Sequence, residues 1–187
     1  MTELSITPEP PDSTLAEALL DRYFGELAAR FPGGPEGFDP ARVAAPASEL
    51  TPPHGVFLLA RRDGRAVGCG AVRTLDADHA EIKRMWVDPA VRGLGIGRGL
   101  LAALESAAAE LGCRTVRLDT AAYLTEALPL YQASGYAEIP AYNDNPYAAH
   151  WLEKHLRSPR LAVTATTSRS VGRRTLPAPE GSARSLT

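Results

Sequence analysis

The run Arg92-Gly93-Leu94-Gly95-Ile96-Gly97-Arg98-Gly99 stands between a strand-like apolar segment and a helix-like one. Glycines at alternate positions let successive main-chain N–H groups turn inward without a Cβ clash. The helix that follows adds its own unpaired N–H groups and the positive end of its dipole. The run therefore predicts a main-chain cradle for a phosphate or diphosphate. A glycine-rich turn that serves only close packing is the alternative.

Apolar patterns on both sides of this run predict a domain that mixes strands and helices. An Asp-Gly turn at 63–64 joins two strand-like segments into a hairpin. Thr14 and Glu17 fit a capping box, which predicts the start of a helix that ends near Phe31. Gly112 is placed to end the helix after the glycine run. Strands or extended segments are expected at 4–7, 55–60, 66–74, 81–87, 115–119, 136–139 and 150–156, and helices at 14–31, 100–111 and 126–134.

Length and charge set the domain organisation. The 187 residues suit one domain, which we expect at 1–157, followed by a disordered basic tail at 158–187 rich in Ser, Thr, Arg, Ala and Pro. The whole chain carries a formal charge of -2, but the first 157 residues hold 15 Lys and Arg against 21 Asp and Glu. An acidic domain argues against nucleic acid as the main partner and is compatible with a cationic substrate.

The two cysteines and the apolar segments indicate where the protein works. Cys69 and Cys113 each lie in an apolar stretch and lack paired metal-ligand spacing, so we expect buried free thiols, no metal and a reducing compartment. No positive n-region precedes an apolar run at the start of the chain, and no segment approaches a membrane-spanning length. The expected location is cytoplasmic, with no membrane partner.

Two common phosphate-binding motifs fit the glycine run poorly. A nucleotide-hydrolysing P-loop needs Lys and then Ser or Thr after its last glycine, whereas Gly97 is followed by Arg98-Gly99. Residues 97–102 match the dinucleotide motif G-x-G-x-x-A, and Asp119 ends the next strand as a ribose-binding acid would. Yet nine residues separate Val87 from Gly97, and too little chain remains for a second mononucleotide half. The dinucleotide fold stays a minor alternative.

The strand, its Asp88-Pro89 stop and Arg92-x-x-Gly95-x-Gly97 together form a unit that resembles the GNAT superfamily of acetyl-CoA-dependent N-acetyltransferases. The family signature is Q/R-x-x-G-x-G/A at the start of a helix. The segment Tyr131-Gln132-Ala133-Ser134-Gly135-Tyr136 resembles a second family motif, so the likeness spans about residues 55–156. It implies an α/β (mixed α+β) fold with a twisted, mostly antiparallel central sheet, a splayed parallel strand pair and flanking helices.

The resemblance also implies roles for particular residues. The amides of Arg92 to Arg98 would hold the diphosphate of acetyl-CoA without a metal, and the strand Met85-Trp86-Val87 would bind the pantetheine arm. Tyr131 takes the place of the general acid that protonates the leaving thiolate. Glu81 takes the place of a general base, although a strand-edge glutamate paired with Lys83 or Arg84 is an equally good reading. The acceptor would be a primary amine of a small molecule or peptide, and family members are often homodimers.

One position departs from the family pattern. Many members carry an asparagine that contacts the pantetheine arm seven residues before the acid tyrosine. This chain has Leu124 there, which cannot make that hydrogen bond, and a water or Thr120 is the candidate substitute. The loop at 142–147 and the segment at 32–53 are expected to border the acceptor site. A degenerate member that senses acyl-CoA without catalysis is the second functional hypothesis.

Overall fold

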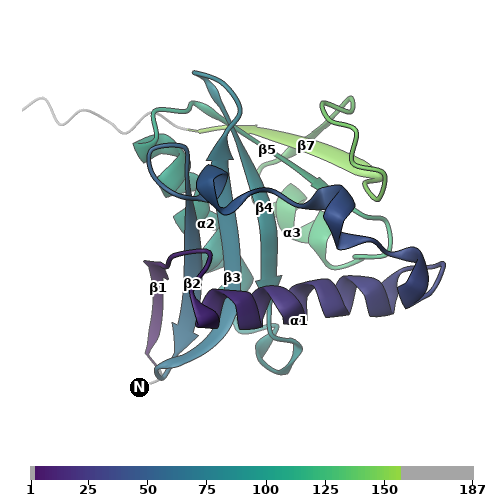
Figure 1. The fold of residues 1–187 in the computed structure, drawn as a ribbon. Helices are drawn as coiled ribbons and strands as arrows, with labels where there is room; N and C mark the ends of the chain where they lie inside the picture. Colours follow the sequence, from purple (N-terminus) through teal and green to yellow (C-terminus); the bar gives the residue numbers. More distant parts are fainter. Residues whose placement is uncertain (1–2, 157–187) are drawn as a thin grey trace, which may run out of the picture.

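In the computed structural model, which describes residues 3–156, seven strands form one twisted sheet in the order β1-β2-β3-β4-β5-β7-β6 (Figure 1). Every neighbouring pair is antiparallel except β4 and β5, which are parallel. The predicted basic tail lies outside the described residues. The strands are β1 (Leu4–Pro8), β2 (Gly55–Arg62), β3 (Arg65–Thr74), β4 (His79–Val87), β5 (Thr115–Thr120), β6 (Ala137–Ile139) and β7 (His150–His155); the helices are α1 (Thr14–Arg30), α2 (Ile96–Glu110) and α3 (Ala127–Ala133).

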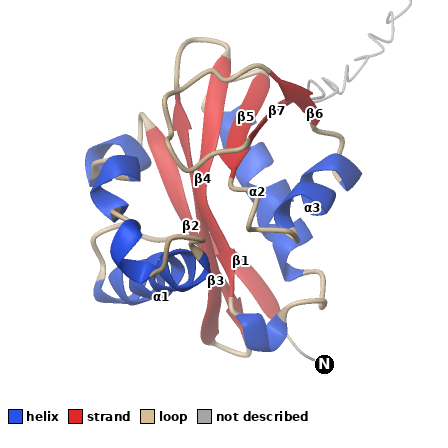
Figure 2. Cartoon of the chain, turned by 90° about the vertical axis from the view of Figure 1, so that its right-hand side faces the viewer, coloured by secondary structure: helices blue, strands red, loops and turns tan. Residues whose placement is uncertain are grey.

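The sheet lies between two helical layers. Figure 2 shows α1 on one face, and α2 and α3 on the other. Successive side chains of a strand point to opposite faces, so one strand supplies both layers. In β2, Phe57 and Leu59 belong to the core under α1, while Leu58 belongs to the core under α2. The two cores hold the sheet rigid on both sides, which fixes the strand ends that build the site.

Gly70 lets α2 approach the sheet closely. A Cβ at this position would lie 2.7 Å from Leu104 Cδ1, which is closer than real Cβ contacts allow. The side chain of Leu104 is fully buried against β3 at this point. A larger residue at position 70 would displace the end of the Leu104 side chain from this tightly packed contact between α2 and β3.

The structure confirms the predicted fold class and overturns two details. A dinucleotide-binding sheet is parallel, whereas this sheet has a single parallel pair, so that alternative is wrong. The cap of α1 is Ser13 and not Thr14, because the Ser13 side chain accepts from the Ala16 amide at 3.1 Å. The predicted Asp63-Gly64 turn is confirmed, with φ of 50° and 77°. Gly112 follows α2 with φ of 92°, as its place after the helix predicts.

The long segment between α1 and β2 carries three short 3-10 turns, Pro35–Gly37, Pro40–Val43 and Ala47–Leu50. Leu50 is almost fully buried, which ties the segment to the core under α1. Neither α1 nor any other helix between residues 3 and 156 is long and apolar enough to cross a membrane.

Candidate active site

The parallel strands β4 and β5 separate soon after they pair. Their register covers only His79 with Thr115, Ala80 with Val116 and Glu81 with Arg117. Beyond these residues a cavity of about 540 Å³ opens between the strands. It runs from the glycine run, past the second half of β4, to α1 and the segments at 38–43 and 145–147. The predicted splay of a parallel pair is therefore present.

A bulge in β4 shapes one wall of this cavity. Cys69 pairs with Trp86, but Ala71 pairs with Lys83, so β4 has one more residue than β3 between these pairs. Arg84, within the bulge, has a φ of 57°, which is unusual for a residue other than glycine. The extra residue changes the alternation of the strand: Ile82 packs under α2, while Trp86 packs under α1. Met85, Trp86 and Val87 all line the cavity, and their contact with a pantetheine arm stays a prediction.

The glycine run presents unpartnered amides at the start of α2. Gly93 and Gly95 have φ of 80° and 81°, and Gly95 caps the helix with no side-chain bond. Within residues 3–156, no N–H from Gly93 to Arg98 has a hydrogen-bond partner, and the first bonded amide is that of Gly99, to the Gly95 carbonyl at 3.0 Å. The run thus keeps the row of free donors that the sequence predicts. Its cavity-lining members are Arg92, Gly93, Gly95, Ile96, Gly97 and Arg98, while the side chain of Leu94 is exposed to solvent.

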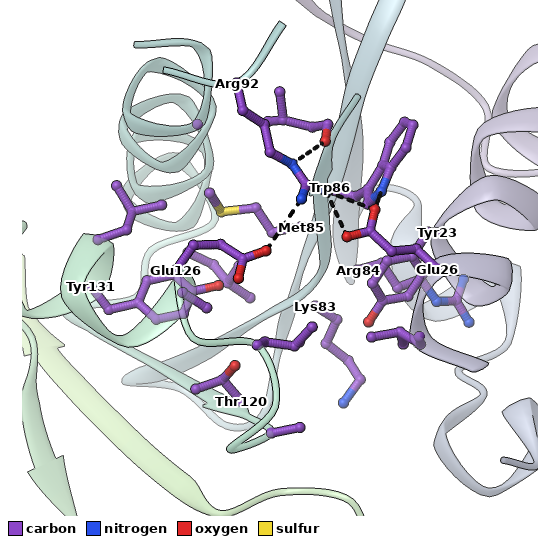
Figure 3. Close-up of a pocket in the computed structure, with 18 of the residues that line it drawn as sticks. Tyr23, Glu26, Lys83, Arg84, Met85, Trp86, Arg92, Thr120, Glu126 and Tyr131 are labelled. Atoms are coloured by element: carbon purple, nitrogen blue, oxygen red, sulfur yellow. Dashed lines mark hydrogen bonds and ion pairs between the residues drawn. The ribbon is translucent and has the colours of Figure 1, made fainter. Parts of the chain in front are cut away.

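The Arg92 side chain is engaged by protein groups. Its Nε donates to the Val87 carbonyl at 3.0 Å, and its terminal nitrogens lie 2.7 and 2.8 Å from the Glu26 carboxylate and 3.3 Å from that of Glu126. Arg30 also bonds both carboxylates, and its hydrogen bond lowers the pKa of Glu126 to about 2. Figure 3 shows Arg92 between the two glutamates, joining α1 to the segment before α3. The Arg92 guanidinium is therefore held by protein groups, and an anion at the run meets the amides from Gly93 to Arg98 instead.

Two tyrosines face each other across the cavity. Tyr131 comes from α3 and Tyr23 from α1, and Figure 3 places them on opposite sides. Burial raises the pKa of both phenols, and the Asp119 carboxylate adds to the shift. The Tyr131 hydroxyl has no hydrogen-bond partner within the described residues, although its ring packs 5.9 Å from that of Tyr136. A protonated phenol that lines a cavity is suited to donate a proton.

Glu81 lies outside the residues that line the cavity. Its side chain is 1% exposed, and its carboxylate accepts from Arg73 at 2.8 Å, Tyr142 at 3.0 Å and Asn143 at 3.1 Å, with the Lys83 ammonium 3.3 Å away. Burial alone would raise the pKa of Glu81, but Lys83 and Arg73 outweigh it and the net shift is downward. The structure therefore separates Glu81 from Tyr131 and the glycine run, and a role as base stays a prediction.

Replacing Glu81 with glutamine should destabilise the protein. The variant leaves Arg73 and Lys83 without their buried counter-charge, and we expect a loss of about 3 kcal/mol in the free energy of unfolding at pH 7. Because the folded pKa is lowered, the contribution exists above the unfolded pKa of about 4.3 and disappears as the pH falls through the folded value. Urea unfolding at pH 7 and at pH 3 measures the difference. Glu138→Gln, in an exposed pair with His150, is the control and should change little; an equal loss in both variants would contradict the account.

Asp119, at the end of β5, is a carboxylate that does line the cavity. Asn143 donates to it at 2.7 Å and Asn145 at 2.6 Å. The same Asn143 amide also donates to Glu81, and Trp151 donates to the Asn143 side-chain oxygen at 2.9 Å. The predicted 142–147 loop therefore reaches the cavity and holds Asp119 in place. From the sequence, Asp119 stands out only as the ribose-binding acid of the dinucleotide alternative.

The 32–53 segment, which is the other predicted border of the acceptor site, also reaches the cavity. So does Leu124, the position that departs from the family pattern. Phe38 and Val43, from the 32–53 segment, line it, and the Phe38 ring lies 4.8 Å from that of Tyr147. Leu124 lines it as well, close along the chain to Thr120. The Thr120 hydroxyl is buried with no partner among the described residues, which leaves a donor and acceptor available on the β5 side. Between residues 3 and 156, no cluster of His, Cys, Asp and Glu is arranged to hold a metal ion.

Comparison with known proteins shows which proteins this chain resembles. The model of the Acetyltransferase (GNAT) family matches residues 15–136. An IAA acetyltransferase of Azospirillum brasilense is 33% identical over 141 residues, which cover 75% of this chain and 85% of that protein. A GNAT family acetyltransferase of Staphylococcus aureus superposes with a TM-score of 0.67 at 19% identity, over 83% of this chain and all of the other. One from Elizabethkingia anophelis, solved with acetyl-CoA bound, gives 0.56 at 21% identity, over 82% and 98%.

Proposed function

Because this chain belongs to the GNAT family of acetyltransferases, we propose that it binds acetyl-CoA in the β4–β5 cavity and transfers the acetyl group to a primary amine by direct attack in a ternary complex. The acceptor is the amine of a small molecule or peptide. One observation carries the proposal: the free amides at residues 93–98 open into the same cavity that Tyr131 lines. A diphosphate held at one end leaves the other end for the acceptor.

The residues fit acetyl-CoA at several points. The amides from Gly93 to Arg98 bind the diphosphate, aided by the positive end of α2. The main chain of β4 at Met85 and Val87, beside the bulge, binds the pantetheine arm. The buried Thr120 hydroxyl supplies a hydrogen bond that Leu124 cannot make. When bound, acetyl-CoA supplies an activated thioester to the acceptor amine.

The chain's own groups then manage the protons. Tyr131 donates its phenolic proton to the sulfur that leaves, and its raised pKa keeps that proton in place until it is needed. Asp119 attracts the ammonium form of the acceptor and accepts one of its protons, which frees the nitrogen lone pair to attack the thioester. The second proton, which the nitrogen loses as the amide forms, replaces the one that Tyr131 gives to the sulfur, and Asp119 releases its proton to solvent. Glu81 acts on this step through Asn143, which bonds both carboxylates and fixes the position of Asp119. Glu81 is in this proposal a positioning residue.

Two measurements on the purified protein test the proposal. Calorimetric titration with acetyl-CoA should show binding, and release of free thiol should follow the addition of a suitable primary amine. Binding without thiol release in a broad screen of amines would select the acyl-CoA sensor and reject the transferase. Absence of acetyl-CoA binding would reject both.

Asp119→Asn should lower kcat/KM for the amine at least about tenfold at pH 7, because the variant loses the group that accepts the ammonium proton. The loss should shrink as the pH approaches the pKa of the acceptor amine, because the amine is then already unprotonated. A pH–rate profile of thiol release measures this. Glu81→Gln is the comparison: its profile should keep the shape of the wild type, and a profile changed by Glu81→Gln but not by Asp119→Asn would exchange the two roles.

A further inference from the structure

Arg84 is a half-buried arginine with no acidic partner. One terminal nitrogen donates to the Ala45 carbonyl at 2.8 Å, and the guanidinium carbon lies 5.8 Å from the centre of the Phe24 ring. The Nε is buried without a hydrogen-bond partner, and no carboxylate within residues 3–156 lies within 4.0 Å of this guanidinium. Burial lowers the pKa of Arg84. A desolvated charge in this state is costly unless an anion joins it.

Three other arginines near the site are paired with carboxylates, whereas Arg84, like Arg42 and like Arg98 at the glycine run, is in no ion pair within residues 3–156. Arg92 and Arg30 share Glu26 and Glu126, and Arg73 lies between Glu81 and Glu49. Arg84 lines the cavity, and Figure 3 places it with Tyr23 on the α1 side, across from Tyr131. A guanidinium that lines a cavity without a counter-ion is suited to bind an anionic group of a ligand.

The acceptor end of the cavity, away from the glycine run, combines positive charge, one carboxylate and apolar surface. Lys83 lines the wall next to Arg84, and Arg42 lies over the Tyr147 ring at 5.9 Å. The carboxylate of this end is Asp119, held by the 142–147 loop. The remaining wall is apolar and aromatic, with Phe24, Leu27, Phe38, Val43 and Tyr147.

We infer that Arg84 is a specificity-determining residue that pairs with a carboxylate of the acceptor, so that the acceptor is an amine that also carries a carboxylate, such as a free amino acid with an apolar side chain. The inference rests on the proposed transfer to an amine. Asp119 then receives the amino group, Arg84 the carboxylate, and the aromatic wall the side chain. Polycations such as polyamines are disfavoured, because the unpaired charge of Arg84 repels them. An acceptor that carries a carboxylate differs from the cationic substrate that the acidic composition suggests.

The test compares three forms of each acceptor: apolar and aromatic L-amino acids, their carboxamides and the corresponding decarboxylated amines. Thiol release from acetyl-CoA gives kcat and KM for the full-length protein. The free acids should be preferred at least about tenfold in kcat/KM, because a charge-assisted pair is lost in the other two forms. In Arg84→Met this preference should disappear, mainly through a higher KM for the acid.

Arg114→Met is the matched control, since it removes an arginine whose side chain is 83% exposed, and it should keep the preference. The ratio of kcat/KM for the acid to kcat/KM for the amide does not depend on the fraction of folded enzyme. A folding defect in Arg84→Met therefore does not imitate the result. Equal use of acids and amides by the wild type, or a preference retained by Arg84→Met, would overturn the inference. Thiol release with decarboxylated amines alone would overturn it and leave the acetyl transfer intact. If acetyl-CoA binds but no acceptor of any form releases thiol, the inference falls with the transferase; if acetyl-CoA does not bind, the proposed function itself fails.

Discussion

Gly97→Glu is expected to remove acetyl-CoA binding while the protein stays folded. Gly97 lines the cavity beside the free amides, and a Cβ there would lie 3.6 Å from Leu130 and 3.9 Å from Met85, an ordinary contact distance. The added carboxylate would therefore fit and would face the site of the diphosphate. Repulsion of about 3 kcal/mol or more between them is a loss of over about 100-fold in affinity.

The same substitution should favour the helix. Glycine is a poor helix former, and an acidic residue in the first turn of α2 interacts well with the helix dipole. Thermal unfolding of Gly97→Glu should thus match or exceed that of the wild type, while calorimetric titration with acetyl-CoA shows the loss. Ala102→Glu makes the same change of charge on an exposed position of the same helix and should bind normally. Wild-type affinity in Gly97→Glu would refute the diphosphate site.

Tyr131→Phe is expected to lower kcat by about 100- to 1000-fold with little change in acetyl-CoA affinity. The phenol has no hydrogen-bond partner within the described residues, so its removal costs the fold little, and the ring keeps its packing against Tyr136. General acid catalysis contributes factors of this size. Since burial raises the phenol's pKa, loss of activity through its deprotonation should not occur below about pH 10.

Two further tyrosine variants make this result specific. Tyr136→Phe removes the hydroxyl of the neighbouring ring, which does not line the cavity, and should keep wild-type turnover. Tyr23→Phe removes the other phenol in the cavity. Stopped-flow measurement of thiol release gives kcat for all three variants. If Tyr23→Phe is slow and Tyr131→Phe is not, the acid is Tyr23, and the assignment made from the Tyr-x-x-x-Gly-aromatic motif is wrong.

Local pattern was enough to predict the order of the elements. Alternation predicted the strands, and helical spacing with Gly112 predicted α2, because these signals depend on residues close in sequence. The capping residue of α1 was misplaced by one position, since Ser13 and Thr14 have similar capping chemistry and only the backbone geometry decides between them.

The bulge in β4 shows where local pattern was insufficient. Arg84 lies in a stretch that alternates only roughly, and the position of the extra residue is seen only when β4 pairs with β3. The bulge is what separates Trp86 from the face of Ile82 and brings Arg84 to the cavity. Strand pairing is a non-local interaction, so a single strand does not reveal it.

For the site, the family, the glycine cradle and the motif that contains Tyr131 could be predicted from the order of residues alone, because each is a short run whose residues act together. The folded chain was needed to show which distant side chains meet: Arg92 bonds Glu26 across 66 positions, Glu81 lies in a buried ion cluster, and Asp119 and Arg84 lie on the cavity wall. Main-chain donors depend on local backbone conformation, whereas the partner of a charged side chain depends on the packing of the whole sheet and both helical layers.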